Sequence, residues 1–526
     1  MNGQLTMASV PSTNGGDSAL VQQQPRPQMN AHYLNLPLEL WQLVYQYLPP
    51  SAVLQGALVS PTLSLSLFCQ SQIWARVGAE DWVFEGVYQG LTRNAALIRR
   101  LSCSGRAKPD VLSVPECRSI THLDIEQIRF LSSSILERIL EHNCEVMQSL
   151  KIRLDRTIFP MVTEKVGRMT ELKELYLQHW EGVQQESIAS ILDTCPQIEV
   201  LSLGHNSLYP FTLDNMKQQE DKSSIVTTVA SNSKDRKLPL TIRSLILDGA
   251  VIFHEELVLN LVSRCPDLES LSMQGCFGIR LSTSFISSLS KLCPRLQRLD
   301  LTNQSTTDDF FSALFYVLPN LRELKLQGSI LNDDDVQVMI QYCGPTLEIL
   351  DIGLCTSLGS RSILSILVNC PHLVRLDARG VDFNPRDMDP ADEWACTLLK
   401  SLYLEILLPK RSHYAVGEPE QIRNKLYQQL ARLNRLESLQ LGAGSKDRGV
   451  NILEMSLLTG LSSLATLTHL QRLDIKRLNH AVRGAEVAWM LKSWPKLQAL
   501  GILLDTNADM ELVRAVHQRN KSIYVW

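Results

Sequence analysis

A short phrase rich in leucine and cysteine recurs along this chain and constrains its fold more than any other feature. Its clearest copies are CPQIEVLSL at 195–203, CPDLESLSM at 265–273, CPRLQRLDL at 293–301 and CPHLVRLDA at 370–378. The leucine that opens the final apolar pair of each copy is the marker leucine of its repeat. The fourteen marker leucines follow one another at about 26 residues except at three longer gaps, and they are Leu123, Leu150, Leu175, Leu201, Leu245, Leu271, Leu299, Leu324, Leu350, Leu376, Leu402, Leu439, Leu473 and Leu500.

Each repeat combines two hydrophobic periods. Around a marker leucine the apolar residues alternate, as at Leu201 and Leu203, which is the period of a strand with one buried face. Between markers the period is helical, since Ile188, Ile191 and Leu192 fall on one stripe. One repeat is therefore a strand and a helix, and because neither buries its apolar face alone, neighbouring repeats must stack.

The repeat resembles the leucine-rich-repeat family, whose pattern is L-x-x-L-x-L-x-x-N/C-x-L. Ile198, Leu201, Leu203, Asn206 and Leu208 match every position of that pattern. The resemblance implies an α/β solenoid with parallel strands on its concave face and helices on its convex face. About fourteen repeats of the cysteine-containing type are expected in residues 111–526, with a flexible insertion at 217–237 and longer insertions near 405–420 and 443–465.

The cysteines follow the repeat and are predicted to be core residues. Of the twelve cysteines in the chain, eight lie six or seven residues before a marker leucine, namely Cys117, Cys144, Cys195, Cys265, Cys293, Cys343, Cys370 and Cys396. A small apolar side chain suits that position. The alternatives are a disulfide framework or a zinc site, but no C-x-x-C pair occurs. We therefore expect no metal and no cofactor.

Composition favours a large soluble protein. The 51 basic and 55 acidic residues give a net charge of −4, which provides no basic field for nucleic acid. No apolar run has membrane length and no signal peptide is evident. We expect a cytoplasmic or nuclear protein, or one found in both compartments, that binds neither nucleic acid nor membrane.

The N-terminus departs from the repeat. Residues 1–32 are rich in Gln, Ser, Asn and Pro and are predicted to be a disordered tail. Residues 33–78 are predicted to be a small all-α helical motif, because Leu40, Val44 and Leu48 share one helical face in its first helix. Residues 79–110 are predicted to be a helical connector or N-terminal cap.

The motif at 33–78 resembles an F-box. The family opens with Leu-Pro-x-Glu-Leu, here residues 36–40, and continues with an aliphatic or aromatic pair, here Val44-Tyr45. Leu48-Pro49 and Ile73-Trp74 match its later positions, whereas residues 60–63 read Ser-Pro-Thr-Leu where the family has Cys-Arg and then Trp. The residues that the resemblance assigns to adaptor binding are Leu36, Pro37, Leu40, Val44, Leu48 and Pro49.

The F-box resemblance implies the substrate-recognition subunit of a cullin-RING ubiquitin ligase. In that family the F-box binds a Skp-type adaptor, and the repeats hold the protein to be ubiquitinated. No catalysis is expected, since the chain has no Walker loop, no H-E-x-x-H and no G-x-S-x-G. The alternative is a non-catalytic leucine-rich-repeat scaffold or regulatory interaction protein whose N-terminal helices only cap the solenoid.

Target binding is expected on the concave face, at the residues one before, one after and three after a marker leucine. Arg375, Arg379 and Tyr403 are the aromatic and guanidinium types that are enriched in binding hot spots. The full set of candidate residues for an unidentified protein target is Arg298, Asp300, Lys325, Arg375, Asp377, Arg379, Tyr403, Glu405, Arg472, Asp474 and Lys476.

Overall fold

A computed structural model of the chain describes residues 76–78, 95–102, 117–125, 133–153, 159–178, 183–184, 191–205, 207–209, 239–389, 393–407, 417–443, 453–478, 481–504 and 524–525. The chain divides into two units, Met1–Cys69 and Gln70–Trp526, and every described residue belongs to the second. The predictions for the tail at 1–32, the adaptor-binding residues and the insertion at 217–237 lie outside the described residues.

Seventeen strands form one sheet, in which each strand pairs in parallel with the strand of the next repeat. In chain order they are β1 (Arg76–Gly78), β2 (Arg100–Ser102), β3 (His122–Ile125), β4 (Ser149–Arg153), β5 (Glu174–Gln178), β7 (Val200–Ser202), β9 (Ser244–Ile246), β11 (Ser270–Ser272), β13 (Arg298–Asp300), β15 (Glu323–Lys325), β16 (Ile349–Asp351), β17 (Arg375–Phe383), β18 (Ser401–Ile406), β19 (Ser438–Ala443), β20 (Arg472–Asp474), β22 (Ala499–Gly501) and β24 (Tyr524–Val525).

The marker leucines form a continuous buried ladder through this sheet. Leu299 pairs with Leu324 and Leu324 with Leu350, and the same register holds from Leu123 to Leu500. Each of the fourteen is no more than 1 % exposed. The strand half of the predicted repeat is confirmed, because the residue that must be buried in each strand pairs with its equivalent in the next.

The sheet starts earlier than the sequence predicts. Val77 of β1 pairs with Leu101 of β2, and Leu101 pairs with Leu123. Strand β1 therefore lies within 33–78, which was expected to be all-α, and strand β2 lies within 79–110, which was expected to be helical. The solenoid does not begin at residue 111. The sequence prediction missed Leu101 because Cys103 stands where a second leucine would complete the marker pair.

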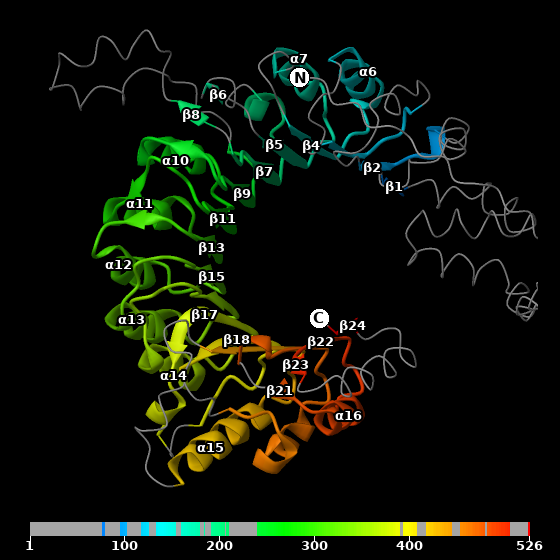
Figure 1. The fold of residues 1–526 in the computed structure, drawn as a ribbon. Coiled ribbons are helices and arrows are strands. Elements are labelled where there is room, and N and C mark those ends of the chain that lie inside the picture. Colours follow the sequence, from blue (N-terminus) through cyan, green and yellow to red (C-terminus); the bar gives the residue numbers. More distant parts are fainter. Residues whose placement is uncertain are drawn as a thin grey trace, which may run out of the picture. The chain divides into compact units, whose positions relative to one another are not determined.

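Helices cover the outer side of the sheet, and the strands line the concave inner side (Figure 1). The described α-helices are α6 (Ser133–Asn143), α7 (Phe159–Val166), α10 (Glu255–Val262), α11 (Thr283–Leu292), α12 (Phe310–Val317), α13 (Asp333–Cys343), α14 (Ser360–Asn369), α15 (Glu418–Arg432) and α16 (Gly484–Ser493). Short 3₁₀ helices are η3 (Ala95–Leu97), η5 (Pro385–Asp387), η7 (Leu457–Thr459), η8 (Leu461–Thr466) and η9 (Lys476–Leu478). The predicted leucine-rich-repeat solenoid is confirmed.

Three smaller parallel sheets follow the strands of the main sheet. They comprise β6 (Val183–Gln184), β8 (Ser207–Tyr209) and β10 (Val251–Ile252), then β12 (Arg280–Leu281) with β14 (Ser305–Thr306), and β21 (Ala481–Val482) with β23 (Leu503–Leu504). No helix among the described residues is long and apolar enough to cross a membrane.

The cysteines of the repeat lie in the core, as predicted. Burial raises the pKa of the Cys370 and Cys396 thiols to about 12, so both stay protonated at neutral pH. The Cys195 Sγ donates to the carbonyl of Val166 in the preceding repeat, at 3.1 Å. The ten cysteines in the described ranges are all buried and unbonded to one another.

Candidate target-binding surface

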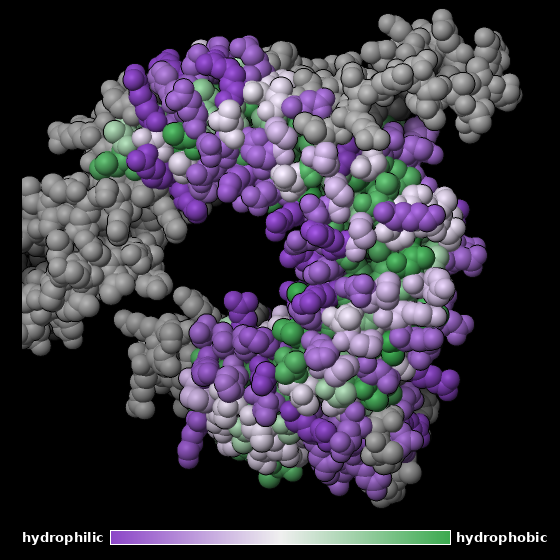
Figure 2. Space-filling view, turned by 180° about the vertical axis from the view of Figure 1, so that it is seen from behind, coloured by the Kyte–Doolittle hydropathy of each residue, from purple (hydrophilic) through white to green (hydrophobic). Residues whose placement is uncertain are grey.

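The parallel register arranges the inner-facing residues in two rows on either side of the marker ladder. The row before the markers reads Arg298, Glu323, Ile349, Arg375, Ser401, Ser438 and Arg472. The row after them reads Asp300, Lys325, Asp351, Asp377, Tyr403, Gln440 and Asp474. Neighbours within a row stand about 5 Å apart. Hydrophilic side chains accordingly line the inner side in Figure 2.

In the first group of candidate residues, Arg298, Asp300 and Lys325, the cations are already ion-paired. The Lys325 ammonium lies 2.9 Å from Glu323 on its own strand and 3.5 Å from Asp300 on the preceding strand. The Arg298 guanidinium lies 3.7 Å from Glu269. Because these charges already have partners within the chain, the group offers a target a polar surface and no unpaired charge.

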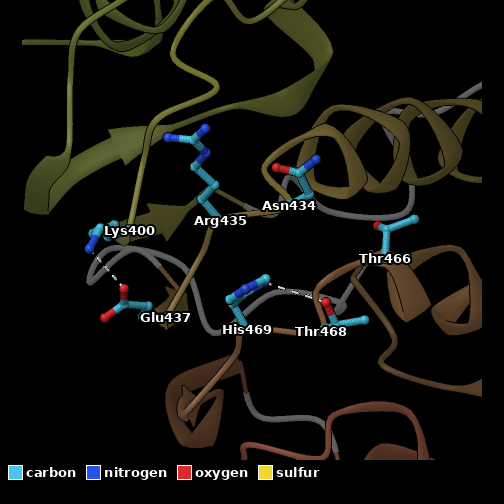
Figure 3. Close-up of a pocket in the computed structure, with 7 residues that line it drawn as sticks. All are labelled: Lys400, Asn434, Arg435, Glu437, Thr466, Thr468 and His469. Carbon is cyan, nitrogen blue, oxygen red and sulfur yellow. Dashed lines mark hydrogen bonds and ion pairs between the residues drawn. The ribbon is translucent and has the colours of Figure 1, made fainter.

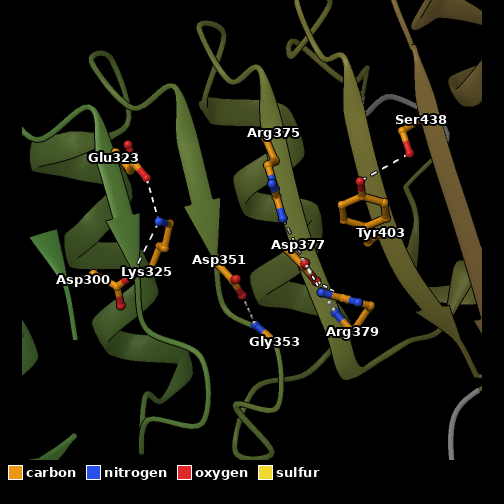
Figure 4. Close-up of polar contacts among 10 residues, drawn as sticks. All are labelled: Asp300, Glu323, Lys325, Asp351, Gly353, Arg375, Asp377, Arg379, Tyr403 and Ser438. Atoms are coloured by element: carbon orange, nitrogen blue, oxygen red, sulfur yellow. Dashed lines mark hydrogen bonds and ion pairs between the residues drawn. The ribbon is translucent and has the colours of Figure 1, made fainter. Parts of the chain in front are cut away.

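The second group, Arg375, Asp377, Arg379 and Tyr403, is called here the arginine–tyrosine cluster (Figure 4). Arg379 donates from Nε and Nη2 to the two carboxylate oxygens of Asp377, at 2.8 and 2.6 Å. The Arg375 Nη2 lies 3.7 Å from the same Asp377 Oδ2. Two arginines thus share the carboxylate of the aspartate between them, because the strand period points these three alternate residues to one face.

Tyr403 of β18 completes the cluster from the next strand. The guanidinium carbons of Arg375 and Arg379 lie 5.5 and 5.3 Å from the centre of its ring, within the range of cation–π attraction. Its hydroxyl lies 3.3 Å from the Ser438 hydroxyl on β19. The ring is held from both sides, so its position does not depend on a bound partner.

Two carboxylates of the predicted target-binding set, Asp377 and Glu405, are buried and contact neighbouring arginines. Asp377 is covered by the arginines that it binds, and its side chain is only 1 % exposed. Glu405 is buried as well, and Arg477 lies 3.4 Å from it. These groups position cations and are not accessible to a target.

Asp351 and Arg477 belong to this surface and were not predicted. Burial raises the pKa of Asp351, and repulsion from Asp377 adds to that effect, whereas the Gly353 N–H, at 3.0 Å, favours the ionised form. Asp351 could have been predicted as an inner-facing residue, because it lies one residue after marker Leu350. Nothing local signals the contact between Arg477 and Glu405, because 72 residues separate them.

The third candidate group lies beyond the cluster. Arg472 and Asp474 lie on β20, next to Ser438 and Gln440 of β19, while Lys476 lies in η9. Asp474 accepts a hydrogen bond from the backbone N–H of Lys476, at 3.2 Å. The structure therefore divides the predicted set into three neighbouring groups along the concave face.

Two grooves lie at the end of the sheet where the strands begin. The larger, of about 610 Å³, is lined by Lys400, Asn434, Arg435, Glu437, Thr466, Thr468 and His469 (Figure 3). The smaller, of about 460 Å³, is lined by Arg322, Pro345, Thr346, Glu348, His372, Val374 and Leu398. Each contains one ion pair of 3.1 Å between residues two before successive markers, Lys400 with Glu437 and Arg322 with Glu348. Within the described ranges, no group of His, Cys, Asp and Glu side chains has the arrangement of a metal site.

Comparisons with known proteins give distant relatives. No family model matches the chain. The chain is 25% identical over 362 residues to F-box/LRR-repeat protein 4 of Bos taurus, a match covering 65% of this chain and 54% of the relative. It is 22% identical over 353 residues to the DNA repair protein rhp7 of Schizosaccharomyces pombe, covering 58% of this chain and 60% of the relative.

The chain therefore spans little more than half the length of these curated relatives. Among solved structures it is similar to a leucine-rich-repeat protein of Leptospira interrogans, with a TM-score of 0.41 and 15% identity over 83% of this chain and 98% of that one. The match to F-box/LRR-repeat protein 4 confirms the resemblance to F-box/leucine-rich-repeat proteins that the motifs indicate.

Proposed function

Starting from this resemblance to F-box/leucine-rich-repeat proteins, we propose that the chain is the substrate-recognition subunit of a cullin-RING ubiquitin ligase of the Skp-cullin-F-box type. The observation that carries the proposal is the order of its two parts, an F-box-like motif followed by a leucine-rich-repeat sheet. The motif holds the adaptor, and the repeats hold the target.

The adaptor contact is assigned to the apolar residues of the motif. The spacing of Leu36, Leu40, Val44 and Leu48 predicts one stripe of a helix, with Pro37 near its start and Pro49 after its last apolar residue. Apolar side chains that are desolvated at the centre of an interface dominate binding energy. A Skp-type adaptor would cover this stripe.

The target contact is assigned to the concave face, centred on the arginine–tyrosine cluster. Arg375 and Arg379 present half-exposed guanidinium groups on an aromatic ring that is already fixed. A subunit of this kind raises the local concentration of its target near the ubiquitin carrier and performs no chemical step itself. We place its action in the cytoplasm or nucleus.

Co-purification with a Skp-type adaptor tests the proposal. The full chain is expected to capture the adaptor, and changing Leu36→Ala with Pro37→Ala is expected to weaken capture by about tenfold or more, since two anchors are lost. Leu38→Ala is the matched control, because Leu38 occupies the variable position of Leu-Pro-x-Glu-Leu. Capture that survives the double change would refute the assignment of this motif.

A second candidate function is a non-catalytic scaffold whose N-terminal helices only cap the solenoid. One observation favours it: β1 (Arg76–Gly78) stands at the end of the 33–78 segment, two residues after Trp74, so the predicted helical part of the motif precedes the first strand in sequence, where a solenoid needs a cap. A wild-type chain that ignores the adaptor would establish this reading instead.

A further inference from the structure

We propose that Arg375 and Arg379 together bind the carboxylate of an acidic side chain in the target protein. This proposal rests on the proposed function in one respect, because it takes the ligand to be a protein. It assigns a chemical class to the ligand of the arginine–tyrosine cluster.

The cluster exposes its cations and hides its anion. The side chains of Arg375 and Arg379 are 46% and 45% exposed, whereas that of Asp377 is 1% exposed. A partner that approaches the concave face therefore meets two guanidinium groups that lie beside an aromatic ring. An anionic group on that partner would find donors without displacing Asp377.

Unused donors remain on both arginines. A guanidinium has five N–H groups, and Asp377 accepts from only Nε and Nη2 of Arg379. Arg375 approaches Asp377 at 3.7 Å, which is too long for a hydrogen bond, and it makes no other side-chain hydrogen bond within the described residues. These donors suit the planar, bidentate geometry of a carboxylate.

The two guanidinium groups are fixed beside each other before any ligand arrives. Both approach one oxygen, Asp377 Oδ2, and both lie over the single ring of Tyr403. Tyr403 is itself held by Ser438. Because the side chains are already ordered, binding costs less conformational entropy than it would with two free arginines.

Local charge gives a phosphate no advantage over a carboxylate. Two carboxylates, Asp351 and Asp377, interact with the two arginines, so the charges in the cluster balance. A dianionic phosphate would meet twice the attraction of the arginines but also twice the repulsion of the carboxylates, so its second charge brings no net gain over a monoanion. The recognition comes from hydrogen-bond geometry rather than from a strong positive field.

The test uses the full chain and short fluorescent Gly/Ser peptides with amidated C-termini, which carry two central glutamates, glutamines or phosphoserines. Fluorescence anisotropy gives each dissociation constant. The glutamate peptide is expected to bind about tenfold more tightly than the glutamine peptide, since a charge-assisted bidentate pair is lost. Tighter binding of the phosphoserine peptide, or equal binding of the glutamine peptide, would overturn the assignment.

Arg375→Gln is the principal variant, because Asp377 keeps both hydrogen bonds from Arg379 and the fold is preserved. It is expected to weaken glutamate-peptide binding about tenfold with an unchanged melting temperature. Arg295→Gln, an exposed arginine that is also ion-paired, is the matched control and should bind as wild type. Wild-type affinity of Arg375→Gln would contradict the proposal. No adaptor is present in this assay, so a failure of adaptor capture and a failure of peptide binding are separate results.

Discussion

At the scale of single residues, the concave face is organised by two buried carboxylates, Asp377 and Glu405. Asp377 holds Arg379 through two hydrogen bonds, and Glu405 holds Arg477. A charged side chain on an exposed strand face is normally assigned to solvent or to a ligand. Here the buried acids fix the positions of the exposed guanidinium groups. The buried residues therefore determine where the hydrogen-bond donors of the surface lie.

Asp351 gives a prediction about pH. Burial raises its pKa above the ordinary value of 3.8, so the folded state binds this proton more tightly than the unfolded chain does. Ionised Asp351 therefore lowers stability, and the penalty is absent at pH values below the unfolded pKa and complete above the folded pKa. In Asp351→Asn the amide oxygen still accepts from Gly353.

We expect Asp351→Asn to become more stable relative to wild type as the pH rises from about 3 to about 7. Urea unfolding at several pH values measures this difference. Gln440→Ala, in the same row, has no titrating group and should show a constant difference. A wild-type advantage that grows with pH would contradict the cause assigned to the shift.

At the scale of elements, polar contacts at the start of one helix also bind the neighbouring helix. The Asn332 side chain accepts from the Asp335 N–H at 2.9 Å, and the Asp335 carboxylate accepts from the Asn332 N–H at 3.2 Å, which forms a capping box on α13. The same Asp335 accepts from the Ser312 hydroxyl of α12, at 2.8 Å. The helix start is thus part of the contact between repeats.

Removing this cap should cost measurable stability. Asn332→Ala is expected to lower the free energy of unfolding by about 1 kcal/mol, the usual cost of losing an N-cap. Asp334→Ala, in the same first turn but exposed, is the comparison and should cost less. Chemical denaturation measures both, and an equal cost for the two variants would argue against the capping box as the cause.

At the scale of the whole molecule, the described repeats form a one-dimensional stack in which each marker leucine contacts its equivalents on either side. Leu350 is fully buried between Leu324 and Leu376. In such an array a defect acts first on its neighbours, because the strand pairings join each repeat to the next one. The central repeats that carry the arginine–tyrosine cluster are therefore sensitive to core changes close by.

Leu350→Ala should test this directly. It is expected to cost about 2–5 kcal/mol through lost burial and a cavity. Hydrogen exchange should rise most in β15, β16 and β17 and least in β3 and β4. Leu458→Ala is the control, since Leu458 is 88% exposed. A uniform rise along the sheet would show that the stack unfolds as one cooperative unit.

The repeat could be predicted from the sequence because its hydrophobic pattern depends on residues that are close together in the chain. A strand with one buried face needs an apolar residue at a fixed position, and all fourteen marker leucines occupy that position. At the start of the main sheet, the prediction missed β1 and β2, whose signals are weaker: Val77 and Leu101 lie in segments without a complete marker pair. The assembly of Arg375, Arg379 and Tyr403 was predictable for the same reason, since the strand period and the register fix their face.

By itself the sequence determined the solenoid, the inner-facing rows and the F-box-like motif, because each depends on spacing between residues near in the chain. Only the tertiary structure decided which of the inner-facing charges are accessible. Glu405 is covered by Arg477 from a later repeat, opposite a register shift between Ala378 and Asp382. Burial of a charge depends on the side chains that neighbouring strands bring over it, and these contacts join residues that no local pattern relates.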